Sequence, residues 1–310
     1  MNIVITGANG FIGSSLVKFF IKSHNILAIS EKPVSKTNLR LTMHEFLDEK
    51  NLSIIKSFEP THFIHTAAIA HRKIKENKDF LKQAIYINQS LPTELYLFAN
   101  KLGIRRFIFL STIGVLGFRT NKNECFNKFS KYNSYDFYSE LKKTAEKQLI
   151  RNSKSSKTEL IIFRPTVVYG KNSPGNFNTL TKLIDYNFIF PLSMRDNKRS
   201  LLYIDNLLSA ISKSLIYPIN SNKIFLLSDK ETISTCDLIR TISKIRNKRI
   251  FIFKLPPFIF NLFKKLPFIK RRISQLTDDL VVDPSNFSKT MEWEQPYSQK
   301  YSFKKSFSEN

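Results

Sequence analysis

The sequence predicts an α/β fold with a doubly wound parallel sheet, and three observations lead to this prediction. Short, almost continuously apolar stretches at 3–5, 62–66, 107–110 and 160–163 are typical of strands that are buried on both faces. Longer stretches with apolar residues at helical spacing separate these strands. A turn rich in glycine directly follows the first strand. Strands that alternate with helices in this way form a parallel sheet with helices on both sides.

The expected elements follow one another along the first part of the chain. Helices are expected at 11–22, 52–58, 82–102 and 138–151, and strands at 3–5, 26–29, 62–66, 107–110 and 160–163. The helix at 82–102 ends at Gly103, which suits its C-terminal cap. A further strand before Asn51 is only weakly marked. Beyond Arg164 the alternation becomes irregular, with turn-forming residues at 171–175.

The turn after the first strand has the spacing of a dinucleotide-binding turn. Its first glycine permits the tight turn, the second lets phosphates approach the backbone, and the third lets the helix pack on the strand. Bare N–H groups and the positive end of the helix dipole then face a pyrophosphate. The cofactor-binding residues expected in this turn are Gly7, Asn9, Gly10, Phe11, Ile12 and Gly13.

Composition excludes several classes of protein. With 310 residues and 42% hydrophobic content, the chain can bury a sizeable core. Cys125 and Cys236 lie far apart and lack metal-ligand spacing, so we expect neither a disulfide framework nor a metal site. The chain begins with a strand rather than an export signal, and no stretch is apolar enough to span a bilayer. A cytoplasmic location is therefore expected.

The formal net charge of +24 leaves several interpretations open. Lysine and arginine are spread along the whole chain without a recognisable nucleic-acid module, so nucleic acid is not an expected partner. A solvated surface, an anionic substrate and an acidic membrane surface remain. In the segment 251–272, apolar residues alternate with basic ones. We expect this segment to pack in the substrate region, with peripheral membrane contact as the alternative.

Tyr138 and Lys142 are the candidate catalytic pair. Four residues apart on a helix, they share one face, and a nearby ammonium is expected to lower the pKa of the phenol towards neutrality. Such a phenol can exchange a proton with a sugar or alcohol while the carbon exchanges hydride with a nicotinamide. The hydroxyls of Ser111 and Thr112, at the end of the strand at 107–110, can position the reacting oxygen.

With these residues the chain resembles the extended short-chain dehydrogenase/reductases, in particular the nucleotide-sugar epimerase/dehydratase family. The resemblance lies in a TGxxGxxG turn, a threonine before a VYG-like segment, a YxxxK pair and an RPxxVYG segment, found here at 6–13, 112–117, 138–142 and 164–170. It covers essentially the whole chain. It implies a Rossmann domain at 1–164 that binds NAD or NADP. Residues 165–310 would then form a smaller substrate-binding region, partly interleaved with the first domain.

The resemblance also assigns roles to single residues. Tyr138 would be the acid/base, Lys142 its electrostatic activator and Thr112, rather than Ser111, the hydroxyl that binds the reacting oxygen. Further family positions are matched by Ala67, Ala68 and His71 in the loop on the cofactor side, by Asn88 as a support of the active-site helix, and by Asn176 and Arg199 at the substrate diphosphate. A second arginine on the diphosphate is not clearly matched, with Arg271 or Arg272 as candidates.

Departures from the family pattern narrow the expected chemistry. The family's 4,6-dehydratases carry an Asp-Glu pair after the active-site threonine, whereas this chain has Ile113 and Gly114, which disfavours dehydration. Leu116 replaces the tyrosine of the VYG segment. At the end of the second strand, Glu31 favours NAD, whereas Ser30 and Lys32 can accept the 2′-phosphate of NADP. The choice between the two cofactors stays open.

The resemblance implies an enzyme that acts at C4 of a UDP-activated hexose or N-acetylhexosamine in surface polysaccharide synthesis. Segments at 225–229, 281–285 and 292–293 resemble a bacterial subgroup that contains both C4 epimerases and C4-keto reductases. A 4-epimerase is the expectation, and a keto reductase of a UDP-6-deoxy-N-acetylhexosamine is the alternative. A catalytically silent NAD(P)-binding regulator is the second alternative. A UDP-sugar is the expected partner, and a homodimer is the assembly considered.

Overall fold

The computed structural model describes residues 1–34, 37–70, 78–193, 197–219, 223–256, 258–259 and 277–308. The chain divides into two compact units. The first comprises Met1–Val115, Tyr132–Arg164 and Ala210–Phe225, and the second comprises Leu116–Lys131, Pro165–Ser209 and Leu226–Asn310. Residues 116–131, which we expected in the first domain, belong to the second unit. The chain therefore crosses between the units before Arg164 as well as after it.

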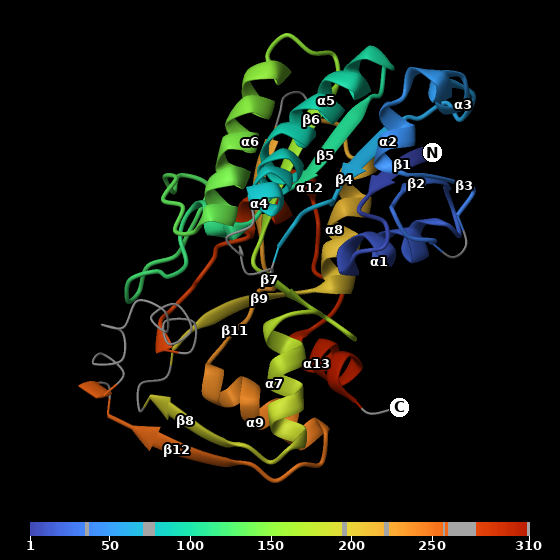
Figure 1. Ribbon diagram of the computed structural model, residues 1–310. Helices are drawn as coiled ribbons and strands as arrows, with labels where there is room; N and C mark the ends of the chain where they lie inside the picture. The colour runs from blue at the N-terminus through green and yellow to red at the C-terminus, as the bar shows by residue number, and fades with distance from the viewer. Residues whose placement is uncertain are drawn as a thin grey trace. The chain divides into compact units, whose positions relative to one another are not determined.

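A seven-stranded sheet forms the centre of the first unit (Figure 1). Its strands, in spatial order, are β10 (Lys223–Leu227), β6 (Glu159–Pro165), β5 (Arg106–Leu110), β4 (His62–His65), β1 (Asn2–Thr6), β2 (Asn25–Ile29) and β3 (Leu39–Leu41). The pairings from β6 across to β3 are parallel. Because β1 lies between β2 and β4, the chain winds in both directions from it. The predicted doubly wound parallel sheet is confirmed.

Helices connect these strands across both faces of the sheet. They are α1 (Phe11–Phe20), α2 (Met43–Leu47), η1 (Glu49–Asn51), α3 (Leu52–Ser57), α4 (Lys78–Ile85), the π-helical turn η2 (Tyr86–Ser90), α5 (Leu91–Lys101), the 3-10 turn η3 (Ile113–Val115), α6 (Phe137–Ser153) and the end of α8 (Ile204–Ile216). Right-handed crossovers place α1 on the face opposite to α5 and α6. Figure 1 shows α5 and α6 side by side.

Aromatic side chains fill the space between the central strands and α5. Phe63 of β4 stacks on Phe107 of β5 with ring centroids 4.9 Å apart, and Tyr96 of α5 meets Phe107 edge-on at 5.4 Å. All three side chains are fully buried. This packing fixes β4 and β5 in register. The carboxyl ends of β1, β4 and β5 therefore meet at one edge of the sheet, where a doubly wound fold places its site.

The buried Arg106 lies at the opposite edge, where β5 begins. The Arg106 guanidinium donates to the carbonyls of Ser214 and, at 2.9 Å, Tyr217, at the C-terminal end of α8. It is paired with the Glu159 carboxylate of β6, which lies 2.8 Å from Nε and 2.5 Å from Nη2. The last carbonyls of a helix lack partners within the helix, so a cation that binds them stabilises the helix end.

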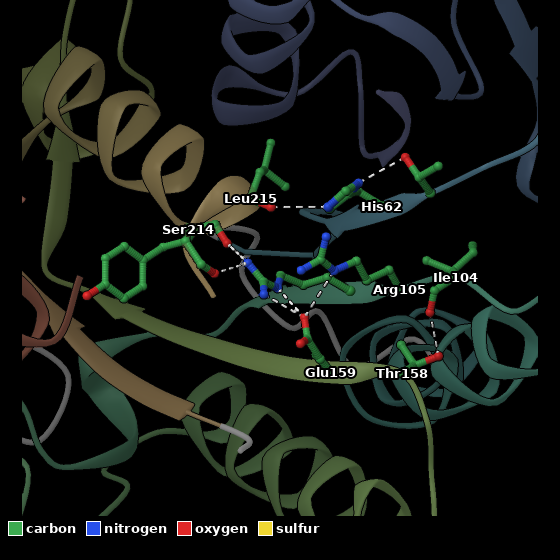
Figure 2. Close-up of polar contacts among 10 residues, drawn as sticks. His62, Ile104, Arg105, Thr158, Glu159, Ser214 and Leu215 are labelled. Atoms are coloured by element: carbon green, nitrogen blue, oxygen red, sulfur yellow. Dashed lines mark hydrogen bonds and ion pairs between the residues drawn. The ribbon is translucent and has the colours of Figure 1, made fainter. Parts of the chain in front are cut away.

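His62 supports the same helix end (Figure 2). Its Nε2 lies 3.2 Å from the Leu215 carbonyl, so this nitrogen carries the proton and donates it. Burial, and then the nearby Arg106 guanidinium, lower the pKa of His62 to about 4. The imidazole is therefore neutral at physiological pH and binds the end of α8 without a charge.

The second unit consists of smaller elements. They are β7 (Val167–Tyr169), α7 (Asn176–Asp185), β8 (Ile189–Ser193), β9 (Arg199–Tyr203), the start of α8, β11 (Thr232–Ile233), α9 (Thr235–Ile245), β12 (Phe251–Leu255), α12 (Ser285–Met291) and α13 (Gln299–Phe307). Strand β9 lies between β11 and β7, and β8 pairs with β12. The buried Asp229 carboxylate binds the Tyr169 hydroxyl, the Tyr203 N–H and the Asn206 amide, which joins these elements.

Candidate active site

The glycine turn leaves little room for side chains. Gly7 has a φ of +67°, and a Cβ atom there would lie 2.7 Å from the Ala67 backbone nitrogen. A Cβ at Gly13 would lie 2.1 Å from the Gly7 carbonyl oxygen, and one at Gly10 would lie 3.2 Å from it. The Gly10 N–H donates to the same oxygen at 2.8 Å. The turn is therefore tight enough to bring bare backbone to its surface.

Helix α1 begins at Phe11, directly after this turn. Gly10 is its N-cap residue and supplies no side-chain cap, and the first turn contains no acidic residue. No side chain of this turn therefore neutralises the positive end of the helix dipole, which stays available to an anion. Asn9 is exposed there, and Phe11 and Ile12 are half-buried. These residues suit the diphosphate of a dinucleotide, for which a helix N-terminus is a general site.

Two threonines hold the loop after β4 against the glycine turn. The Thr66 hydroxyl donates to the Thr6 carbonyl at 2.6 Å, and the Thr66 N–H donates to the same carbonyl at 3.3 Å. The Thr6 hydroxyl oxygen in turn lies 2.7 Å from Nδ1 of the buried His65. Ala67 and Ala68 follow, half-buried and exposed respectively, beside Gly7. The predicted cofactor-side loop thus adjoins the turn, and His71, which was predicted to belong to it, lies outside the described residues.

Asn88 fixes the same loop from the other side. It is buried in the π-helical turn η2, and its amide makes two hydrogen bonds of 3.1 Å, to the N–H and the carbonyl of Ile69. Both functional groups of the side chain are thereby satisfied. Such π-helical turns often occur at functional sites. The turn η2 also contacts α6, and the support of the active-site helix by Asn88 stays a prediction.

Ser30 directly follows β2 and is one of the residues expected to bear on the choice between NAD and NADP. It is buried, and its hydroxyl donates to the Lys32 carbonyl at 2.7 Å and accepts the Lys32 N–H at 3.3 Å. The hydroxyl is thus engaged in its own turn rather than presented to a 2′-phosphate. Glu31 accepts the N–H of Met43 at 3.2 Å, at the start of α2.

Lys142 is buried on α6, one turn after Tyr138. Its Nζ donates to the Leu110 carbonyl at 2.9 Å and lies 4.4 Å from the centre of the Phe109 ring. The ammonium therefore joins α6 to the end of β5. Burial lowers the pKa of Lys142 to about 7, and the Glu146 carboxylate acts in the opposite direction.

Tyr138 is half-buried in the first turn of α6. The helix starts there because Asp136 is its N-cap and accepts the Ser139 N–H at 2.8 Å. Burial, and then the Asp136 carboxylate, raise the pKa of Tyr138 above its ordinary value. The expectation that Lys142 lowers this pKa is therefore wrong for this structure. Desolvation of the phenol dominates, and the Lys142 ammonium is directed to the Leu110 carbonyl.

Thr112 follows the end of β5 and is half-buried. Its hydroxyl oxygen accepts the Gly114 N–H at 3.1 Å, so the hydroxyl proton remains available to another acceptor. The neighbouring Ser111 hydroxyl is fully buried and has no partner among the described residues. Of the two, Thr112 is therefore the one open to a ligand.

The two positions after Thr112 have little space for further groups. Ile113 is 5% exposed. A Cβ at Gly114 would lie 2.4 Å from the hydroxyl oxygen of Ser139, a buried residue of α6. A larger side chain at 114 would have to displace that hydroxyl. The packing thus matches the absence of an acidic pair at 113 and 114.

Asn176 and Arg199 lie in the second unit. Asn176 is exposed at the first position of α7, after Gly175 with a φ of +74°. Arg199, at the start of β9, is partly buried and donates to the Asp278 carbonyl at 3.3 Å. Burial lowers the pKa of Arg199 to about 10, although Asp278 and Asp279 oppose this shift. Arg271 and Arg272 lie outside the described residues.

The sequence did not lead us to the buried carboxylate beside Lys142. Glu146 is fully buried and binds Arg164 and the Tyr132 hydroxyl. The sequence did contain an indication of this contact, since a glutamate four residues after a lysine on a helix lies one turn away on the same face.

Among the described residues there is no cluster of potential metal ligands and no helix long and apolar enough to cross a bilayer.

Comparison with known proteins gives consistent matches over this chain. The profile of the NAD dependent epimerase/dehydratase family matches residues 3–225. A UDP-glucose 4-epimerase of Vibrio cholerae is 30% identical over 98% of this chain and 93% of its own length. The N-acetyl-alpha-D-glucosaminyl-diphospho-ditrans,octacis-undecaprenol 4-epimerase of Escherichia coli O157:H7 is 23% identical over 82% of this chain and 75% of its own.

Solved structures share the fold over almost the whole chain. The UDP-glucuronic acid 4-epimerase of Bacillus cereus in complex with NAD has a TM-score of 0.78 at 19% identity and covers 99% of this chain and 97% of its own. The UDP-glucose 4-epimerase of Thermotoga maritima with UDP-glucose has a TM-score of 0.78 at 18% identity, with the same coverage. At these identities the match establishes the fold.

Proposed function

The chain belongs to the NAD-dependent epimerase/dehydratase family, and we propose that it is a 4-epimerase of a UDP-activated hexose or N-acetylhexosamine. One observation carries the proposal: the buried Lys142 ammonium binds the end of β5, so that Thr112, after that strand, and Tyr138, on the same helix as Lys142, belong to one rigid arrangement. The name of the Vibrio cholerae relative, which matches over nearly its full length, supports this substrate class.

The first unit suits the family's cofactor, NAD, which is one of the two cofactors predicted. Gly7, Gly10 and Gly13 would hold the diphosphate, because a Cβ at Gly7 or Gly13 would overlap the backbone and one at Gly10 would cover the outside of the turn. Glu31, rather than the engaged Ser30 hydroxyl, would bind the adenosine ribose. When bound, NAD supplies the hydride acceptor and a positive charge that favours the ionised form of the nearby phenol.

Three side chains would take part in the proton transfer at the C4 oxygen. The Thr112 hydroxyl, whose oxygen already accepts the Gly114 N–H, would donate its hydrogen bond to that oxygen. Tyr138 would take the proton from the C4 hydroxyl and return it after the sugar has presented its other face. Lys142 would keep α6, and with it Tyr138, in place against the end of β5 through its hydrogen bond to the Leu110 carbonyl.

Dehydration is not part of the proposal. An elimination needs an acid and a base near the sugar, and the family's dehydratases place them directly after the active-site threonine. Here Ile113 is apolar and buried, and Gly114 lies against Ser139.

In the second unit, Asn176 and Arg199 would bind the substrate diphosphate, for which a guanidinium has suitable bidentate geometry. The assignment of residues 165–310 to substrate binding, and the homodimer, stay predictions.

A panel of sugars tests the reaction. The purified protein is incubated with UDP-hexoses and UDP-N-acetylhexosamines, with NAD alone and with added NADH or NADPH, and products are separated by chromatography. A 4-epimerase interconverts C4 epimers without net use of reduced cofactor. A keto reductase consumes reduced cofactor only with a 4-keto sugar. Bound NAD without turnover of any sugar would instead indicate a silent regulator.

The panel should include one sugar linked to a polyprenol through a diphosphate. The Escherichia coli O157:H7 relative is named for such a substrate. Both substrate classes present a sugar on a diphosphate, so the same Asn176 and Arg199 would serve either. Conversion of the lipid-linked sugar alone would overturn the UDP-sugar assignment and keep the C4 chemistry.

A further inference from the structure

An exposed apolar surface covers one face of the small sheet formed by β8 and β12. Phe251 pairs with Ile189 in the parallel register of these two strands. Alternate residues of a strand share a face, so Phe253 lies on the same side as Phe251. Phe251 is 63% exposed, Phe253 52% and Ile189 59%. On the other side Phe190 is buried, so the two faces differ in exposure at this position.

Further exposed aromatic residues lie next to the two strands in the chain. Tyr186 precedes β8 and is 82% exposed, and Phe258 follows β12 and is 70% exposed. Phe188 packs instead against the buried Phe190, with ring centroids 5.5 Å apart. We call the following five residues the aromatic surface: Tyr186, Ile189, Phe251, Phe253 and Phe258. Single exposed apolar residues are common on proteins, but a contiguous group is typical of an interaction site.

The sequence around the strand β12 is rich in basic residues. Residues 238–277 contain eleven lysines and arginines and no aspartate or glutamate. Lys182 on α7, Lys244 on α9 and Arg249 before β12 are exposed. The acidic residue at the end of α7, Asp185, is bound by Arg246 at 2.5 Å and 2.8 Å. The aromatic surface therefore lies in a strongly positive part of the chain.

We propose that the aromatic surface docks the protein peripherally on an anionic lipid bilayer. Aromatic side chains favour the boundary between headgroups and acyl chains, and flanking lysine and arginine side chains favour anionic headgroups. Exposed aromatic residues within a positive field satisfy both requirements. The contact is peripheral because no described helix is long and apolar enough to cross a bilayer.

A second copy of this chain is a less suitable occupant. A symmetric dimer pairs a surface with itself, so Lys244 and Arg249 of one copy would approach the same basic residues of the other. This repulsion opposes association through the aromatic surface. A bilayer rich in anionic lipid offers the opposite charge instead. The bilayer inference is independent of the reaction proposed for the site.

Co-sedimentation with vesicles tests the proposal. The full chain is mixed with vesicles of phosphatidylcholine alone or with phosphatidylglycerol added, and bound protein is quantified. We expect binding to the anionic vesicles only. The double variant Phe251→Thr/Phe253→Thr should lose at least about tenfold in partition, because each phenylalanine removed takes a large apolar area out of the contact. Threonine keeps the preference of these positions for a strand.

Two further variants separate the contributions. Lys244→Gln/Arg249→Gln should lose about fivefold for each charge removed, and the loss should shrink at high salt. Phe129→Thr is the matched control, because Phe129 is 80% exposed outside the aromatic surface and should bind like the parent. Unchanged NAD binding and thermal unfolding verify that each variant is folded.

The vesicle experiments distinguish docking on a bilayer from the alternatives. Loss of vesicle binding in both double variants, with Phe129→Thr unaffected, supports the proposal. Equal vesicle binding by the parent and Phe251→Thr/Phe253→Thr overturns it, as does binding that ignores lipid charge. Absence of vesicle binding, together with a dimer in sedimentation velocity that Phe251→Thr/Phe253→Thr abolishes, overturns it in favour of a second copy.

Discussion

Arg164 holds the buried carboxylate of Glu146 with hydrogen bonds from both Nε and Nη2, the latter at 2.6 Å. The same carboxylate accepts the Tyr132 hydroxyl at 2.8 Å, and the Arg164 guanidinium lies 4.8 Å from the centre of the Tyr132 ring. Tyr132 and Arg164 are the first and last residues of the segment that contains α6 in the first unit. Glu146 therefore fixes both ends of that segment, one turn beyond Lys142.

Glu146→Gln is expected to destabilise the protein by about 3–5 kcal/mol, the cost typical of leaving one partner of a buried ion pair alone. The buried Arg164 guanidinium would lose its counter-charge, while the shape of the side chain stays almost the same. Urea unfolding followed by circular dichroism measures the change. Glu140→Gln is the matched control on the same helix, because Glu140 is exposed and pairs with Lys143 at the surface. Equal stability of the two variants would show that the pair is dispensable.

The same substitution should also change the pH dependence of activity. The Glu146 carboxylate raises the pKa of Lys142 against burial, which lowers it to about 7. Without this carboxylate the pKa of Lys142 falls further, so the ammonium loses its proton at lower pH. We expect the alkaline limb of the kcat profile of Glu146→Gln to move to lower pH. A limb that coincides with that of the parent would mean that the charge of Lys142 does not limit turnover.

The sequence predicted the features that depend on neighbouring residues, but not those that depend on distant residues or on burial. The glycine turn and the strand from 107 to 110 are local, and both lie where they were expected. The pairing of Glu146 with Arg164 joins residues 18 apart across two elements, so spacing alone did not indicate it. The raised pKa of Tyr138 follows from its burial, which no residue type encodes. Residues 116–131 belong to the second unit, which the sequence did not indicate because irregular segments carry no period.

Gly10→Ala is expected to weaken NAD binding at least about tenfold, because an added methyl group keeps a phosphate away from the helix N-terminus. The φ of −75° at Gly10 is accessible to alanine, and the new Cβ would lie 3.2 Å from the Gly7 oxygen. The fold should therefore survive with a small adjustment. Quenching of intrinsic fluorescence by NAD measures the affinity. Gly103→Ala, where a Cβ meets nothing within 4 Å, should retain parental NAD affinity even if its φ of +71° lowers stability.

His62→Gln should make the stability less sensitive to acid. In the folded protein the pKa of His62 is about 4, and an unfolded histidine has a pKa of about 6.5. Between these values the unfolded state binds more protons, so folding stability falls as the pH drops from about 6.5 to 4. The loss from this group is about 3 kcal/mol. A glutamine amide can still donate to the Leu215 carbonyl but does not titrate.

Urea unfolding at pH 7 and at pH 4.5 measures this difference in both proteins. We expect the parent to lose more of its free energy of unfolding between the two pH values than His62→Gln does. An identical loss would show that His62 titrates at its ordinary pKa despite its burial. Because both proteins share all other titratable groups, including Asp229, their contributions cancel in the comparison.

Tyr138→Phe should lower kcat by about 10²- to 10⁴-fold, the range typical of losing a positioned proton donor and acceptor. The ring stays in place, so NAD affinity and thermal unfolding should remain at parental values. Tyr135→Phe is the matched control, since Tyr135 is exposed just before α6 and should keep full activity. Turnover is measured with the sugar that the panel identifies, at saturating substrate and NAD. Near-full kcat in Tyr138→Phe would assign the proton transfer to another group, and the Thr112 hydroxyl, open to a ligand at the end of β5, would then be the next to replace.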